Sequence, residues 1–225
     1  MPSLLLVRHA QASYGSADYD VLSELGHRQA AVLAADLKRR GLAPDRLVCG
    51  TLHRQRDTIA AIAQALGQVP VEEDAGWNEY DSQDILTHHS GGGVQLDGPG
   101  AGAVSSHDFQ GLLDGALAAW IAAGPDGPAA ESWTAFRNRV HGALRSLAGG
   151  LGRGQTALVC SSGGAIGTAA AELLGLGETG MITLNRVAIN TGVTRVVAGA
   201  RGMTLVSFNE HGHLDGQDPA LRTYR

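Results

Sequence analysis

The first strand-like segment of the chain places the tightest limit on its fold. Residues 3–7 form an uninterrupted run rich in leucine and valine, which ends at Arg8 and His9. Such a short apolar run is typical of a strand in a parallel sheet that is covered on both faces. Ligands of these sheets bind just beyond the carboxyl ends of the strands. Because arginine is rarely buried unpaired, Arg8 and His9 at this place predict contact with an anion.

Two later segments repeat the succession of apolar run, polar turn and helix. Residues 46–49 precede Arg54 at the start of a predicted helix, where a cation is unfavourable unless an anion offsets its charge. Residues 156–160 precede Ser162 and Gly163, which open another predicted helix. A turn of small residues into a helix N-terminus is suited to accept phosphate. Both segments therefore predict an anion site at the same edge of the sheet as Arg8.

Alternation of strands and helices along the chain predicts an α/β fold with a mostly parallel sheet. Residues 187–197 and 203–208 predict two final strands that form an antiparallel edge. At 225 residues the chain is expected to be a single domain, 1–225, with a loop or lid insertion at about 80–130. The last ten residues are polar, and we expect them to form a loose tail.

Composition limits the partners and the compartment. A formal charge of −5 and a pI near 5.9 argue against nucleic acid or an anionic membrane as the main partner. No apolar stretch approaches the length of a membrane span or a signal-peptide core. Cys49 and Cys160 lie in apolar runs and are expected to be buried thiols, which indicates a reducing, cytoplasmic location. His88, His89 and His107 share no helical or strand face, so we predict no metal site.

The string Leu-Val-Arg-His at residues 6–9 resembles the signature of the histidine phosphatase superfamily, also called phosphoglycerate mutase-like. Four further blocks follow in the order typical of that family, and the resemblance extends from residue 3 to about 214 with a gap over the 80s to 120s. These blocks are residues 22–30, 50–58, 76–81 and 131–140. In the second of them Leu52, Arg54 and Thr58 match, which favours Arg54 over Arg56 as the second phosphate-binding arginine. The resemblance implies a three-layer α/β/α sandwich.

The resemblance also implies a chemical role for each matching residue. His9 would attack phosphorus and become a phosphohistidine, while Arg8 and Arg54 hold the equatorial oxygens. Glu79 matches the position of the general acid that protonates the departing oxygen. A carbonyl or carboxylate on the other ring nitrogen of His9 is expected to fix its tautomer.

The implied substrate is a phosphorylated small molecule, with no metal and no cofactor. Four residues are expected to contact the phosphate or the rest of the substrate: Gln11, Ser13, Ser162 and Gly163. A phosphatase is favoured over a mutase, because the mutase pattern after the histidine is replaced here by Gln11, Ala12 and Gly15. Neither the individual substrate nor the oligomeric state is specified by these features.

One departure from the family affects the site itself. Ser162 stands where the family has a second catalytic histidine, and Gln55 and Asp57 also depart from the pattern. Losing one preorganised donor commonly costs on the order of 10²–10³ in rate. Two alternatives to an active phosphatase follow. One is a phosphate-binding or regulatory protein without turnover.

The other alternative is a serine hydrolase that uses Ser162 within Cys-x-Ser-x-Gly, a string close to a nucleophile elbow. His211 and His213 would then be candidate bases. They are also candidates to compensate for the missing second histidine, although a histidine in this place is also explained by a structural role. The serine hydrolase hypothesis leaves Arg8, His9 and Arg54 without a function.

Overall fold

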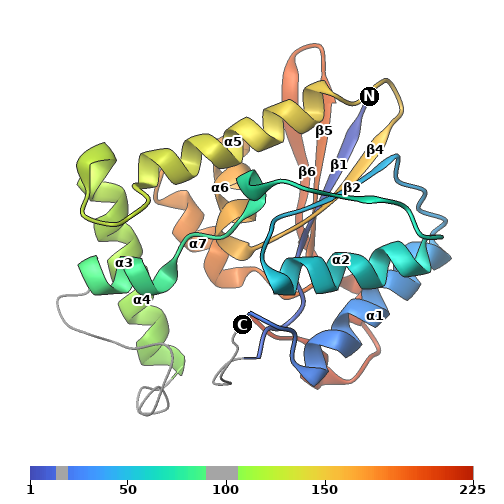
Figure 1. The fold of residues 1–225 in the computed structure, drawn as a ribbon, viewed down its shortest axis with the longest axis horizontal. Helices are drawn as coiled ribbons and strands as arrows, with labels where there is room; N and C mark the ends of the chain where they lie inside the picture. The colour runs from blue at the N-terminus through green and yellow to red at the C-terminus, as the bar shows by residue number, and fades with distance from the viewer. Residues whose placement is uncertain (14–19, 90–105, 225) are drawn as a thin grey trace.

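A six-stranded sheet with the order β3-β2-β4-β1-β5-β6 forms the centre of the computed structural model, which describes residues 1–13, 20–89 and 106–224 (Figure 1). The strands are β1 (Ser3–Arg8), β2 (Arg46–Cys49), β3 (Val71–Glu73), β4 (Thr156–Ser161), β5 (Val193–Gly199) and β6 (Gly202–Glu210). The first four strands run parallel, and β5 and β6 add the antiparallel edge. The predicted α/β architecture is confirmed.

Helices cover both faces of the sheet because successive strand side chains point in opposite directions. Leu5 and Val7 of β1 pack with α1 and α2, whereas Leu4 and Leu6 belong to the larger core shared with α3 to α7. The helices are α1 (Glu24–Arg39), α2 (His53–Ala65), α3 (Ser82–His89), α4 (Ser106–Ala123), α5 (Trp133–Gly149), α6 (Gly163–Leu174) and α7 (Gly180–Val187). Figure 1 shows α3 and α4 beside the start of α5, away from the strands.

Local signals at the helix ends agree with the sequence. Ser23 accepts a hydrogen bond from the Gly26 amide at the start of α1, and Ser132 accepts one from the Ala135 amide at the start of α5. A serine at this position satisfies one of the free N–H groups of the first turn. Gly175 ends α6 in the left-handed conformation with φ 65°, as a terminating glycine does.

Two segments before the C-terminal tail differ from the sequence-based expectations. Helix α3 occupies part of the segment predicted as a loop, where Ile85 and Leu86 are buried. Helix α4 occupies a later part of the same segment, and residues 90–105 between the two helices lie outside the described residues. The predicted strand over 187–197 is wrong in its first half: α7 ends at Val187 and β5 begins at Val193. The intervening turn includes Thr191 at φ 63°, a backbone conformation that no strand residue adopts.

The C-terminal segment is docked against the body of the protein, which corrects the prediction of a loose tail. Leu221 is 2% exposed, and its carbonyl accepts a hydrogen bond from Gln29 Nε2 at 2.8 Å. The Thr223 hydroxyl bonds both Gln29 and Asn190. The contacts with Gln29 join residues more than 190 positions apart, so the local sequence contained no sign of them.

The two cysteines are free, buried and adjacent in the sheet. Cys49 of β2 and Cys160 of β4 are register partners, and burial raises the pKa of both thiols. Within the described residues, no helix combines the length and the hydropathy needed to cross a bilayer.

Candidate active site

The carboxyl end of β1 places His9 between two neighbouring segments. The His9 amide donates to the Ser161 carbonyl of β4 at 2.8 Å, and Asn190 Nδ2 donates to the His9 carbonyl at 2.9 Å. The residue is 6% exposed. Its backbone is therefore held from both sides, and the imidazole has a defined position at the edge of the sheet.

Hydrogen bonds on both ring nitrogens define the protonation of His9. Nδ1 lies 2.7 Å from the Ala10 carbonyl, which can only accept, so Nδ1 holds the proton. Nε2 is then the acceptor for Arg54 Nε, at 3.1 Å. Burial and the charges of Arg54 and Arg8 hold the pKa of His9 well below its usual value, against the opposing effect of the Ala10 carbonyl. The prediction that a carbonyl fixes the tautomer is confirmed, and the ring is neutral with its lone pair at Nε2.

Arg54 lies in the first turn of α2 and its charge is offset by a carboxylate. Its Nη1 pairs with Asp20 Oδ1 at 2.5 Å, and Asp20 Oδ2 accepts from the His53 amide at 2.8 Å. The anion expected at this helix N-terminus is thus in part supplied by the protein. Arg56, by contrast, pairs with Glu73 on the surface, which supports Arg54 as the arginine of the site.

Arg8 lies against the N-terminus of α6. Its Nη1 donates to the carbonyl oxygens of Ala188 and Tyr224, the latter at 2.8 Å, and these contacts fix one end of the guanidinium. A Cβ at Gly163 would lie 3.4 Å from Arg8 Nε and 2.3 Å from Asn185 Oδ1. Glycine at 163 therefore permits the close approach of Arg8 and Asn185 to the helix terminus.

Glu79, in the segment that follows β3, also lies at the N-terminus of α6. Its Oε2 accepts a hydrogen bond from the Gly164 amide at 2.9 Å, and its Oε1 accepts one from the Tyr80 amide at 3.2 Å. Burial raises the pKa of Glu79, while the Gly164 amide and the charge of Arg54 act in the opposite direction. A half-buried carboxyl of this kind retains its proton to a higher pH than an exposed one.

Ser162 is held by Gln55, a residue that the sequence analysis assigned no role. Both side chains have no exposed surface, and Gln55 Nε2 donates to Ser162 Oγ at 2.8 Å. Gln55 Nε2 also lies 3.1 Å from the Trp77 carbonyl, which accepts a second hydrogen bond from Ser161 Oγ at 2.7 Å. The departure of Gln55 from the family pattern was the available signal. Its meaning emerges only from the contact with Ser162.

Gln11 and Ser13, predicted to contact substrate, are tied to the segment that leads into α1. Gln11 Oε1 accepts from Ser23 Oγ at 2.8 Å, and the Gln11 amide donates to Gln29 Oε1 at 2.8 Å. The Ser13 amide donates to the Val21 carbonyl at 2.8 Å. These hydrogen bonds hold residues 11–13 against residues 21–29.

His211 and His213 make structural contacts near β5 and β6. His213 Nε2 is 2.9 Å from Thr191 Oγ1, and burial lowers the pKa of His213 to about 4. His211 Nδ1 is 2.7 Å from the Asn209 carbonyl. These contacts agree with the structural interpretation of His213. Within the residues that the structure describes, no group of three histidine, cysteine or acidic side chains could hold a metal ion.

Comparison with protein families shows that residues 4–90 and 105–211 match the sequence pattern of the histidine phosphatase superfamily (branch 1). The chain belongs to this superfamily. A curated relative, the 2,3-bisphosphoglycerate-dependent phosphoglycerate mutase of Chelativorans sp. (strain BNC1), is 35% identical over 91 residues. That match spans 37% of this chain and 44% of the length of the mutase.

Several solved structures share the fold. A phosphoserine phosphatase mutant from Entamoeba histolytica, in complex with phosphoserine, has a TM-score of 0.67 at 20% identity, covering 95% of this chain and 100% of that chain. The mycobacterial glucosyl-3-phosphoglycerate phosphatase has a TM-score of 0.66 at 23% identity, covering 92% and 98%. Bacillus stearothermophilus YhfR has a TM-score of 0.71 at 17% identity, covering 96% and 100%. The proteins similar to this chain thus include both phosphatases and a mutase.

Proposed function

We propose that this protein is a phosphomonoesterase that hydrolyses a phosphate ester through a phosphohistidine on His9, without a metal. The observation that carries the proposal is the state of the His9 ring: Nδ1–H is bonded to the Ala10 carbonyl and Nε2 presents its lone pair to Arg54. A neutral imidazole whose unprotonated nitrogen faces a guanidinium is prepared to attack a group that draws this guanidinium away from the nitrogen by binding it.

In the first step, the lone pair of His9 Nε2 forms a bond to phosphorus while the bond from phosphorus to the ester oxygen breaks. The leaving oxygen takes the proton of Glu79 and departs as an alcohol. Arg8 and Arg54 donate to the equatorial oxygens, and the N-terminus of α6 adds to the positive potential there. The Nδ1 proton stays hydrogen-bonded to the Ala10 carbonyl, and the new positive charge is delocalised over the imidazole ring.

In the second step, water attacks the phosphohistidine and restores the enzyme. The Glu79 carboxylate formed in the first step accepts a proton from this water, the N–P bond breaks, and phosphate leaves with His9 neutral again. The environment of each group suits its role, because burial and cations lower the pKa of His9, whereas burial raises the pKa of Glu79 and lets it hold its proton to a higher pH than an exposed carboxyl. Turnover of alkyl phosphates is therefore expected to be fastest in weakly acidic solution, above the lowered pKa of His9 and below the raised pKa of Glu79.

The substrate class that fits this site is a phosphorylated small molecule. Solved structures of phosphoserine phosphatase from Entamoeba histolytica, which has the same fold, contain phosphoserine in one case and 3-phosphoglyceric acid in the other. Two free, buried thiols suit a reducing compartment, and we place the enzyme in the cytoplasm.

A mutase is the second candidate, and the 35% identity to a phosphoglycerate mutase favours it. A mutase would return the phosphoryl group from His9 to a second hydroxyl of the substrate instead of to water. Gln11 and Ala12 depart from the mutase pattern, which is the reason to rank hydrolysis first. Product analysis with 3-phosphoglycerate, with and without a bisphosphorylated primer, separates the two activities, because hydrolysis releases inorganic phosphate and transfer releases an isomer.

The hypothesis of a binding protein without turnover depends on Ser162. Its hydroxyl accepts a hydrogen bond from Gln55 and its side chain has no exposed surface, so in this structure Ser162 presents no donor to a phosphoryl oxygen. A phosphate site with one donor fewer favours slow or absent turnover. The serine hydrolase hypothesis gains no support from the geometry, because Ser162 Oγ is bonded to Gln55 while His211 and His213 bond Asn209 and Thr191.

Hydrolysis of 4-nitrophenyl phosphate by the native protein, with and without EDTA, tests the proposal against two variants. His9→Ala should abolish turnover, whereas His27→Ala, which removes an exposed histidine on α1, should leave it unchanged. Rapid quenching should trap an acid-labile, alkali-stable phosphoenzyme that His9→Ala lacks. Turnover that persists in His9→Ala, or that EDTA abolishes, would contradict the mechanism. Absence of turnover combined with stabilisation by inorganic phosphate would support the binding hypothesis.

A further inference from the structure

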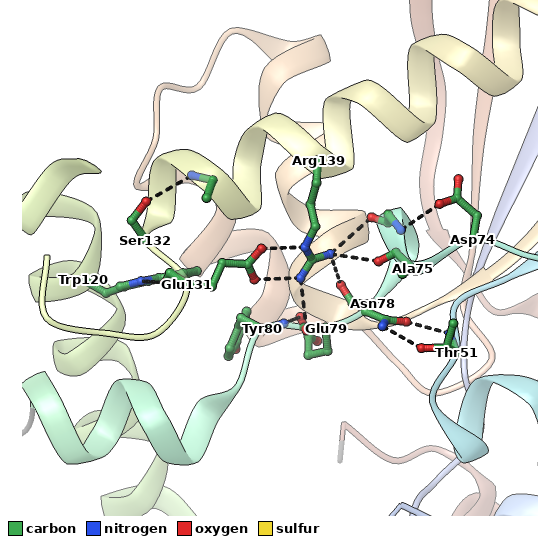
Figure 2. Close-up of polar contacts among 12 residues, drawn as sticks. Thr51, Asp74, Ala75, Asn78, Glu79, Tyr80, Trp120, Glu131, Ser132 and Arg139 are labelled. Atoms are coloured by element: carbon green, nitrogen blue, oxygen red, sulfur yellow. Dashed lines mark hydrogen bonds and ion pairs between the residues drawn. The ribbon is translucent and has the colours of Figure 1, made fainter. Parts of the chain in front are cut away.

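Arg139, on α5, gathers the carbonyl oxygens of the segment that contains Glu79 (Figure 2). Its Nη1 donates to the carbonyls of Gly76 at 3.2 Å and Asn78 at 2.8 Å, with the Ala75 carbonyl at 3.5 Å. Its Nη2 donates to the carbonyl of Glu79 itself at 3.3 Å. One side chain thus contacts four of the five backbone carbonyls between residues 75 and 79, the segment that bears the Glu79 carboxyl.

The guanidinium of Arg139 is itself held in a fixed plane. Glu131 accepts from Nε at 2.6 Å and from Nη2 at 2.9 Å, a bidentate pair that defines orientation as well as position. The ring of Phe136 lies 4.7 Å from the guanidinium carbon. The Glu131 carbonyl in turn accepts from Trp120 Nε1 at 2.8 Å, so the pair is attached to the buried aromatic core (Figure 2).

The segment held by Arg139 delivers two further contacts of the site besides Glu79. The Trp77 carbonyl accepts from Gln55 and Ser161, next to Ser162. Asn78 Oδ1 accepts from the Thr51 amide at 2.6 Å, and Asn78 Nδ2 donates to Thr51 Oγ1 at 2.8 Å, just before α2 (Figure 2). A Cβ at Gly76 would lie 2.7 Å from the Cβ of Ala143, so this segment also packs tightly on α5.

The geometry points to Arg139 as the positioning residue of the general acid: through Glu131 on one side and the 75–79 backbone on the other, it holds the Glu79 carboxyl at the start of α6. This inference rests on the proposed function of Glu79. Arg139 contacts Glu79 at its backbone carbonyl and its charge is paired with Glu131, so Arg139 acts through the backbone and not through its charge. Lysine at position 139 would keep the charge and lose the planar fork.

Two phosphate esters with different leaving groups separate this role from a general structural one. The 4-nitrophenolate ion leaves without help, whereas the benzyl alkoxide of benzyl phosphate needs a proton from the general acid. The value of kcat/KM reports the first step, in which the P–O bond breaks. We expect Arg139→Lys to lower kcat/KM for benzyl phosphate by about 10²-fold and that for 4-nitrophenyl phosphate by no more than about threefold, the pattern of a misplaced acid.

The matched control is Arg137→Lys, two residues away on α5. Arg137 pairs with Glu172 and Glu178 on the surface, and its replacement should leave both rates unchanged. In a Glu79→Gln background, Arg139→Lys should cause no further loss on benzyl phosphate, because the group that it positions is already absent. Inorganic phosphate should stabilise Arg139→Lys as much as the native protein, since Arg8 and Arg54 are untouched.

Glu131→Gln, which breaks the bidentate pair but keeps Arg139, gives a second variant should Arg139→Lys fail to fold. It should show the same selective loss, smaller in size. Equal losses on the two esters, no loss on either, or a further loss in the Glu79→Gln background would overturn the inference. Failure of the proposed function would instead appear as turnover that His9→Ala leaves unchanged.

Discussion

Placing a histidine at position 162 tests how Gln55 and Ser162 depend on each other. Both side chains have no exposed surface, and their polar atoms are 2.8 Å apart, so an imidazole at 162 competes with the Gln55 amide for the same space. Overpacking a well-packed interior typically costs about 1–3 kcal/mol. Ser162→His alone should therefore lower the unfolding free energy by about 1–3 kcal/mol and should not raise activity.

Gln55→Ala alone removes the donor to Ser162 and leaves a cavity. The Trp77 carbonyl keeps its second donor, Ser161, so the principal loss is at the buried Ser162 hydroxyl and should cost about 1–3 kcal/mol. In Gln55→Ala/Ser162→His the imidazole occupies the space that the amide vacates. The double variant should be more stable than the sum of the two single changes by about 0.5–3 kcal/mol, the coupling typical of residues in contact.

The same cycle measures the catalytic cost of the departure from the family. If the missing donor limits the rate, the double variant should hydrolyse 4-nitrophenyl phosphate faster than the native protein, by up to about 10²–10³-fold in kcat/KM. The assays are urea unfolding of all four proteins and steady-state kinetics. Additive stability changes, or a Ser162→His protein as stable as the native one, would refute the competition for space. A stable double variant with no gain in rate would refute the limiting role of the donor.

Two further predictions concern the helix terminus and the buried histidine. Gly164→Ala should strongly reduce turnover of benzyl phosphate, because the added Cβ would lie 2.3 Å from Glu79 Oε1. Gly142→Ala on α5 is the control: its Cβ meets no atom within 4 Å, so this variant should retain activity and gain up to about 1 kcal/mol of stability. Equal activities of the two variants would contradict this account. The pKa of His213 is lowered to about 4 in the folded protein, so between pH 6.5 and 4 the unfolded chain binds a proton at this residue that the folded chain does not bind. The unfolding free energy should therefore fall as the pH drops from 6.5 towards 4, by about 3 kcal/mol from this residue. Urea unfolding of His213→Gln over that range should show a shallower decline.

Most of the sheet and the candidate nucleophile His9 could be predicted from the sequence because their signals are local. A short apolar run between polar turns specifies a buried strand, and this identified β1, β2 and β4. Serine at the start of α1 and glycine after α6 marked helix ends for reasons contained within a few residues. His9, Arg8, Arg54 and Glu79 were found through short blocks whose order along the chain resembles that of the family.

The sequence could not predict contacts that join distant segments. Asp20 was not expected to pair with Arg54, the tail was not expected to dock through Leu221, and Arg139 was placed in a block that was given no chemical role. Hydrophobic periodicity reports which face of an element is buried, and it contains no information about which polar group lies opposite. The predicted strand over 187–192 was wrong for the same reason, because β-branched residues there suit a strand locally while the chain turns at Thr191.

The sequence by itself determined a parallel α/β framework and a histidine between two arginines at the end of the first strand. Only the tertiary structure decided the working state of that histidine: which nitrogen holds the proton, which guanidinium faces the lone pair, and how the acid reaches the start of α6. The physical reason is that strand and helix preferences arise from neighbouring residues, whereas protonation and orientation arise from burial and from hydrogen bonds between segments distant in the chain. Gln55 and Ser162, two separate departures in the sequence, become one buried pair in the fold.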